Sequence, residues 1–183
     1  MTVKSMELTG GRRLSLGIYY TLVFALALYI AGAGMHQFIT GTLINALLFI
    51  TCSRFGLKYA LVLGMATPLA AVAGGILPAP FLALLPAIAL GNGLLSSVYS
   101  LLSGKNRALA VSAAASVKFL FLYGAALFLS AYPVKLALPT GVYPVVISET
   151  LARMMMAPQL LTALSGGLLA HAFLYILKKT GRE

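Results

Sequence analysis

Lys118 is the residue of this sequence with the clearest potential for chemistry. It lies in the middle of an apolar run, Ala108 to Ser130, in a chain whose residues are 61% hydrophobic. A lysine at the centre of a membrane helix costs about 2.5–3.5 kcal/mol on insertion scales, so it normally faces a polar cavity or a partner. The amine is about ten residues, or ~15 Å, from either end of the run, too deep to reach the headgroups comfortably. We therefore expect Lys118 to face a binding cavity, with pairing to a buried acid as the alternative.

Other polar residues in or beside the apolar runs complete a candidate substrate-binding set. They are three amides, a charged pair and a histidine: Asn45, Asn92, Gln159, Glu149, Arg153 and His36. We predict an outward-opening pocket in which Lys118 and the arginine face a negative or carbonyl-bearing group while the amides orient it. The alternative for the amides is interhelical hydrogen bonding, at roughly 0.6 kcal/mol each. For the charged pair it is an exposed i, i+4 contact, and for the histidine a solvated loop position.

Catalytic and metal-binding functions have little support. The chain has three acids, two histidines and one cysteine, Cys52. Ser165 and His171 are faintly like the residues of an intramembrane serine protease, but they share one predicted helix and stand on opposed faces, whereas a nucleophile and its base must come within hydrogen-bond reach. The sequence has no carboxylate cluster for a metal-dependent phosphotransferase and no Walker-type loop. We predict no catalytic residue, metal site or cofactor, and any ATP hydrolysis must come from another chain.

The composition is that of a membrane protein. Only 9% of the 183 residues are charged, whereas a soluble domain carries roughly a quarter. A net charge of +10 is compatible with nucleic-acid binding. Here, however, nearly all the cations lie in short gaps between apolar runs, which is typical of a protein held among anionic lipid headgroups. We therefore expect membrane lipids, and no nucleic acid, as partners.

Six apolar segments approach the length of about 20 residues that a helix needs to cross the hydrocarbon. We predict an all-α, six-helix transmembrane bundle forming a single domain over residues 1–183, with spans at 14–34, 38–53, 57–77, 80–102, 108–130 and 157–177. The first segment follows basic residues as a signal peptide would, but it exceeds the usual ~7–15 apolar residues. We interpret it as a retained span.

The cations also predict the orientation of the bundle. One set of loop ends carries most of them: Lys4, Arg12, Arg13, Arg54, Lys58, Lys105, Arg107, Lys178, Lys179 and Arg182. The opposite set carries only Lys135 and Arg153. The positive-inside rule then places both termini in the cytoplasm and the protein in the inner, cytoplasmic membrane of the cell. The longest outer connection, 131–156, is predicted to be a structured loop in which Ser148 caps a short helix before Pro158 starts the last span.

Three segments resemble the fourth, fifth and sixth spans of one branch of the substrate-binding (S) components of energy-coupling factor (ECF) vitamin transporters. They are Leu84–Asn92, Val117–Tyr123 and Pro158–Leu164. The resemblance implies capture of a vitamin or related micronutrient in the outer half of the bundle, with Asn92, Lys118 and Gln159 as ligand residues. It also implies a transmembrane coupling subunit and two cytoplasmic ATPases. The alanine pattern that docks the coupling subunit would correspond to Ala27 and Ala31.

Two other classes of function remain open. A structural scaffold of a cell-envelope complex would have no pocket, and its Lys118 would pair with a partner subunit. An intramembrane enzyme would depend on Ser165 and His171. The S-component interpretation predicts a small, anionic or heteroaromatic solute.

Overall fold

The computed structural model of the chain describes residues 10–75, 82–132, 134–138, 141–145 and 148–181, and within them all side chains except those of 10–13, 136–145 and 149–157. The described elements follow one another along the chain: α1 (Gly10–Gly32), α2 (Gln37–Arg54), α3 (Leu57–Ala73), α5 (Leu85–Leu102), α6 (Arg107–Ala131), β1 (Val134–Leu138), β2 (Gly141–Val145) and α7 (Glu149–Lys179). The predicted helical class is confirmed, and each of the six apolar segments overlaps a helix of the described residues, although 76–77 and 80–81 lie outside them.

In the part of the chain that the structure describes, four helical segments are long and apolar enough to cross a membrane. They are Leu14–Gly32, Leu85–Leu102, Arg107–Ala131 and Pro158–Lys179. The helix α3 is also apolar but has only 17 residues. Large apolar side chains on these helices point outward, among them Leu22, Leu101 and Leu168. Such faces need an apolar surrounding, so length, composition and exposure together indicate a membrane protein.

The connection between α6 and α7 differs from the predicted loop. It contains a two-stranded antiparallel sheet in which Val134 is paired with Val145 and Leu138 with Gly141. Short runs of valine, leucine and tyrosine on either side of a Pro-Thr-Gly sequence favour such a hairpin. The prediction of a loop did not take this pattern into account.

The predicted short helix that ends before Pro158 is wrong. Instead, α7 runs without a break from Glu149 to Lys179, with Pro158 inside it. A proline removes one intrahelical hydrogen bond, but neighbouring helices and local adjustment make this tolerable in membrane helices. The last helix therefore extends beyond the predicted span toward the sheet.

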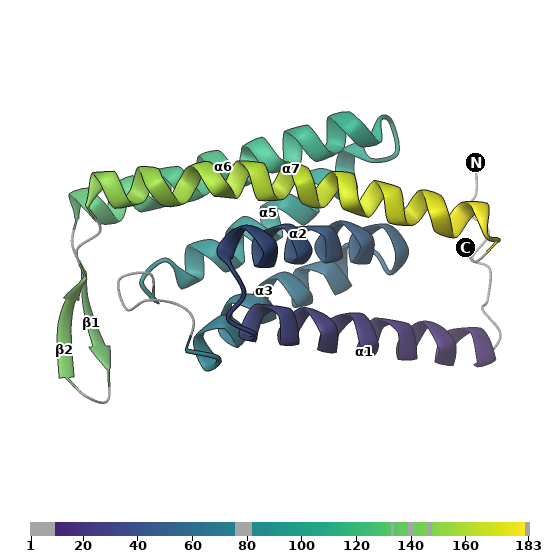
Figure 1. The fold of residues 1–183 in the computed structure, drawn as a ribbon, viewed down its shortest axis with the longest axis horizontal. Coiled ribbons are helices and arrows are strands. Elements are labelled where there is room, and N and C mark those ends of the chain that lie inside the picture. The colour runs from purple at the N-terminus through teal and green to yellow at the C-terminus, as the bar shows by residue number, and fades with distance from the viewer. Residues whose placement is uncertain (1–9, 76–81, 133, 139–140, 146–147, 182–183) are drawn as a thin grey trace.

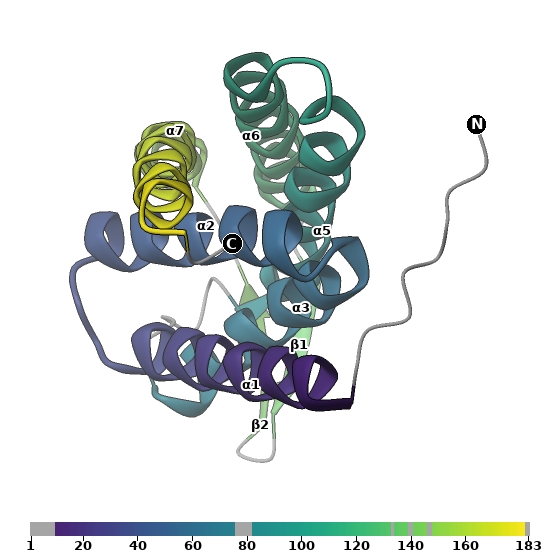
Figure 2. The same ribbon diagram turned by 90° about the vertical axis from the view of Figure 1, so that its right-hand side faces the viewer.

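In the view of Figure 1 the helices run back and forth between the two ends of the bundle. The α2–α3 turn, the α5–α6 turn and the end of α7 lie at one end of the bundle, and the α1–α2 turn and the sheet lie at the other. The most extensive contacts join α2 with α7 and α5 with α6, while α3 packs on α5 and α1. Figure 2 shows that α1 and α2 are inclined to α6 and α7.

Glycines allow the closest helix contacts. A Cβ atom at Gly166 of α7 would lie 2.7 Å from both the Cβ of Asn45 and the carbonyl oxygen of Thr42 on α2. On α3, a Cβ at Gly64 would lie 2.9 Å from the Cβ of Asn92 on α5. Small residues of this kind let membrane helices approach until their backbones touch. Gly166 in the last helix and Gly64 in α3 thus serve packing inside the chain.

Replacing Gly166 with alanine should destabilise the protein. The added methyl group would collide with backbone atoms of α2, which cannot turn aside as a flexible side chain can. We expect the free energy of unfolding to fall by about 1–3 kcal/mol, as for other overpacked sites. Thermal unfolding in detergent measures the change.

Gly124 provides the matched control, because it also lies in a helix but a Cβ there would meet no atom within 4 Å. Gly124→Ala should leave stability unchanged or raise it by up to about 1 kcal/mol through helix propensity. Equal losses in the two variants would show that close approach at Gly166 is unimportant.

Candidate polar centre

Lys118 is enclosed in the bundle. Its side chain is 4% exposed. The Nζ atom donates hydrogen bonds to Oδ1 of Asn45 and to Oδ1 of Asn92, each over 2.7 Å. This length is in the range of charge-assisted hydrogen bonds. The amine on α6 thereby connects α2 and α5, two helices whose own contact is small.

Asn92 is held on both sides of its amide group. Its Oδ1 accepts from Lys118, while its Nδ2 donates to the carbonyl oxygen of Gly64 over 3.0 Å and to Oγ1 of Thr67 over 3.4 Å. Both acceptors belong to α3. Because the amide uses its oxygen toward α6 and its nitrogen toward α3, its orientation is determined by its partners.

Asn45 makes a corresponding connection to α7. Its Nδ2 donates to Oγ1 of Thr162 over 3.4 Å. The Thr162 hydroxyl in turn donates to the backbone carbonyl of Gln159 over 3.2 Å. Lys118, Asn45, Asn92, Thr67 and Thr162, here called the polar centre, link α2, α3, α5, α6 and α7 through buried side chains.

The binding cavity expected at Lys118 stays a prediction. The alternative, a buried acid, differs from what is observed, because the partners of Nζ among the described residues are two neutral amides. The sequence treats Asn45 and Asn92 as separate candidates for a ligand group or an interhelical contact. In the structure, Lys118, Asn45 and Asn92 form one hydrogen-bonded unit.

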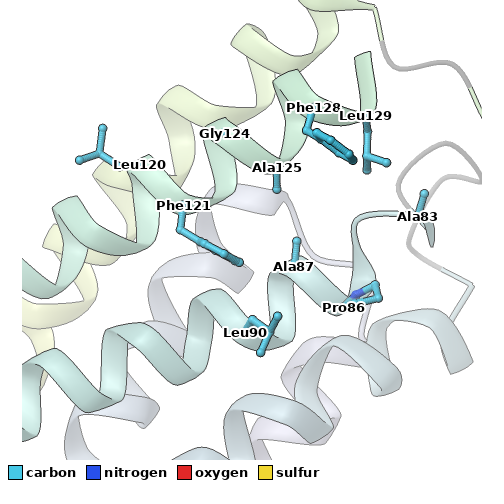
Figure 3. Close-up of a pocket in the computed structure, with 10 residues that line it drawn as sticks. All are labelled: Ala83, Pro86, Ala87, Leu90, Leu120, Phe121, Gly124, Ala125, Phe128 and Leu129. Atoms are coloured by element: carbon cyan, nitrogen blue, oxygen red, sulfur yellow. The ribbon is translucent and has the colours of Figure 1, made fainter. Parts of the chain in front are cut away.

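An open groove of about 540 Å³ lies between α5 and α6 but does not include Lys118. Its walls carry apolar side chains and Gly124 (Figure 3). Three of these side chains, Leu90, Leu120 and Phe128, are at least 60% exposed. The groove therefore lies on the outer, lipid-facing surface of the helix pair and offers no side-chain hydrogen bond to a solute.

The two threonines of the polar centre were missed by the sequence analysis. Thr162 follows Gln159 by three residues and so shares its helix face, a spacing that could have revealed it. Thr67 has no comparable signal, because its role depends on how α3 meets α5. Threonine is common in membrane helices, where its hydroxyl usually bonds within its own helix.

The remaining predicted ligand residues lie outside the polar centre. Gln159 is half-buried one turn from Thr162. His36 is exposed and caps α2, because its Nδ1 accepts a hydrogen bond from the backbone N–H of Phe38 over 3.3 Å. Glu149 and Arg153 belong to the first turns of α7, and their side chains lie outside the described residues.

The predicted docking residues are covered by the chain itself. Ala27 is 0% exposed and Ala31 4% exposed, and both belong to the hydrophobic core. Their helix, α1, packs on α2 and α3. A coupling subunit could touch these alanines only after α1 had separated from its neighbours.

Ser165 and His171, the residues of the enzyme alternative, are not joined by a hydrogen bond at Nε2 of His171, because this nitrogen has no partner among the described residues. Within the part of the chain that the structure describes, no three side chains of histidine, cysteine, aspartate or glutamate are grouped as metal ligands.

Comparison with known protein families, with curated proteins and with solved structures finds no match.

Replacing Lys118 with methionine should destabilise the protein. Methionine has a similar length and adapts to irregular cores, but Oδ1 of Asn45 and of Asn92 would each lose a donor. A buried acceptor left unsatisfied costs about 1–3 kcal/mol, so we expect a loss of stability of at least that size in thermal unfolding.

Lys58→Met is the control, because Lys58 is exposed at the start of α3. It should unfold like the parent. A Lys118→Met protein as stable as the parent would mean that burying the amine costs as much as its two hydrogen bonds contribute.

Proposed function

We propose that this protein is the substrate-capture (S) component of an ECF-type importer and that its solute binds at the polar centre. The solute is a small micronutrient with an anionic or carbonyl-bearing group. The observation that carries the proposal is the buried Lys118, held by amides from two other helices in the middle of the bundle.

The charge of Lys118 supports an anionic solute. The sequence contains no aspartate, and its three glutamates are Glu7, Glu149 and Glu183. Glu149 starts α7, and Thr162, which marks the level of the polar centre, comes 13 residues later (162 − 149). At 1.5 Å per residue this separation is about 20 Å along the helix. Two amide oxygens stabilise an ammonium group only in part, so an anion would complete its coordination.

The three segments that resemble S-component spans also meet at this place. Asn92 and Lys118 come from two of the segments and bond to each other directly. The third segment supplies Thr162, which bonds to Asn45. Side chains from separate spans converging on one amine are what a solute site inside a helix bundle requires.

The proposed topology has six spans with both termini in the cytoplasm. It is supported by the arrangement of the basic segments, because the α2–α3 turn, the α5–α6 turn and the end of α7 lie together at one end of the bundle (Figure 1). These segments contain Arg54, Lys58, Lys105, Arg107, Lys178 and Lys179. Since cations concentrate on the cytoplasmic side, this end is taken as the inner one and the sheet as the outer one.

Import against a gradient needs energy from other subunits. The sequence has no Walker-type loop, so we propose a transmembrane coupling subunit and paired cytoplasmic ATPases as partners.

A scaffold of a cell-envelope complex is the second candidate. It is favoured by the way in which the polar centre links five helices through the chain's own hydrogen bonds. In a scaffold these bonds would serve helix association alone.

Identification of the bound solute separates the two candidates. The full chain is purified in mild detergent and its small molecules are extracted and identified by mass spectrometry. We expect one small organic anion or carbonyl compound at near-stoichiometric amounts with the parent and with Lys58→Met, and at least tenfold less with Lys118→Met. Absence of any solute from the folded parent protein would favour the scaffold.

The topology is tested with single cysteines in a Cys52→Ser background. Lys135 on β1 and Lys105 in the α5–α6 turn are both exposed. In intact cells a membrane-impermeant maleimide should label Lys135→Cys, whereas Lys105→Cys should react only after permeabilisation. The reverse pattern would invert the proposed orientation.

A further inference from the structure

The two amides that hold Lys118 are anchored unequally. Asn92 directs its nitrogen at the Gly64 carbonyl oxygen over 3.0 Å and at Thr67. Among the described residues, Asn45 directs its nitrogen at one partner, the Thr162 hydroxyl, over the longer distance of 3.4 Å. Asn92 is thus the better-fixed acceptor of the pair.

The anchoring partners also differ in chemistry, because Asn92 faces a carbonyl oxygen in addition to the Thr67 hydroxyl, whereas Asn45 faces the Thr162 hydroxyl. A carbonyl oxygen such as that of Gly64 only accepts hydrogen bonds, so it requires a donor at the Asn92 position. A hydroxyl both donates and accepts. Thr162 Oγ1 now donates to the carbonyl of Gln159 and accepts from Asn45. By rotation it could instead donate to an oxygen placed where the Asn45 amide lies.

The two amides also differ in their position within the bundle. Lys118 and Asn92 lie on α6 and α5, which pack extensively on each other, whereas Asn45 lies on α2, which packs mainly on α7. The Cβ of Asn45 is fixed by the backbone of Gly166, but the amide beyond it can turn about its side-chain torsions. Release of Asn45 would therefore leave the Lys118–Asn92 bond in place.

We infer that a carboxylate of the captured solute replaces the Asn45 amide on Lys118, while Asn92 stays as the fixed second acceptor. One carboxylate oxygen accepts from Nζ of Lys118 and the other accepts from the Thr162 hydroxyl. This inference rests on the proposed function and narrows its solute class to small carboxylic acids. Asn45 is then the residue that determines access to the amine.

The matched variants Asn45→Asp and Asn92→Asp test the inference, because each puts a carboxylate of the same shape beside Lys118. At position 45 the new carboxylate can accept from both Lys118 and Thr162. At position 92 it would face the Gly64 carbonyl oxygen with no hydrogen between them. We expect the melting temperature to rise by about 3 °C or more for Asn45→Asp and to fall by about 3 °C or more for Asn92→Asp.

Solute analysis of the same preparations completes the test. The solute extracted from the parent should carry a carboxylate, and Asn45→Asp should retain at least tenfold less of it, because its own carboxylate occupies the position. Stabilisation by Asn92→Asp, loss of the fold in Asn45→Asp, or a parent solute with no carboxylate would each overturn the inference. A bound solute without a carboxylate would leave the proposed function intact, whereas a solute-free parent would remove that function whatever the order of melting temperatures.

Discussion

The need of a buried amine for acceptors is the constraint on which the middle of this bundle depends. Lys118 is buried inside the bundle, so its amine must obtain its hydrogen bonds from other parts of the chain. Asn45 and Asn92 accept these hydrogen bonds through their side-chain oxygens. Through its side-chain nitrogen, Asn45 donates to α7 and Asn92 donates to α3. One charged side chain thereby specifies the relative positions of five helices. Apolar contacts alone would specify them less strictly, because lipid tails are as apolar as leucine.

The same network requires its side chains to lie close together. Hydrogen bonds of 2.7 Å require Lys118 to contact Asn45 and Asn92 directly. Helices with bulky residues at the crossing points could not bring them so close, and the glycines of α3 and α7 remove that obstacle. The hydrogen bonds of the polar centre therefore depend on the close packing of the helices. Under the proposed function, a solute would compete with an existing internal acceptor, which would favour ligands that bond to Lys118 more strongly than a neutral amide does.

Much of the fold could be predicted from hydropathy alone, because the length of each apolar run and the polar or turn residues between runs determine where membrane helices lie. Lys118 was recognisable for the same reason, as a charge in an apolar run. Its partners were less predictable, since sequence spacing gives neighbours within a helix but not between helices. The alanines of α1 show this limit. Ala27 and Ala31 form a small-residue pattern, but both side chains are packed in the core of the chain. The continuity of α7 through Pro158 likewise depends on neighbouring elements rather than on local propensity.

Each asparagine that holds the lysine has a glycine from a neighbouring helix directly behind its Cβ: Gly166 behind Asn45 and Gly64 behind Asn92. Because these glycines have no side chain, each asparagine can lie directly against the neighbouring helix. A larger residue at either position would push the asparagine away from that helix while leaving every polar residue in place. Under the proposed function, such substitutions on α3 or α7 would change the space available to a solute at the polar centre.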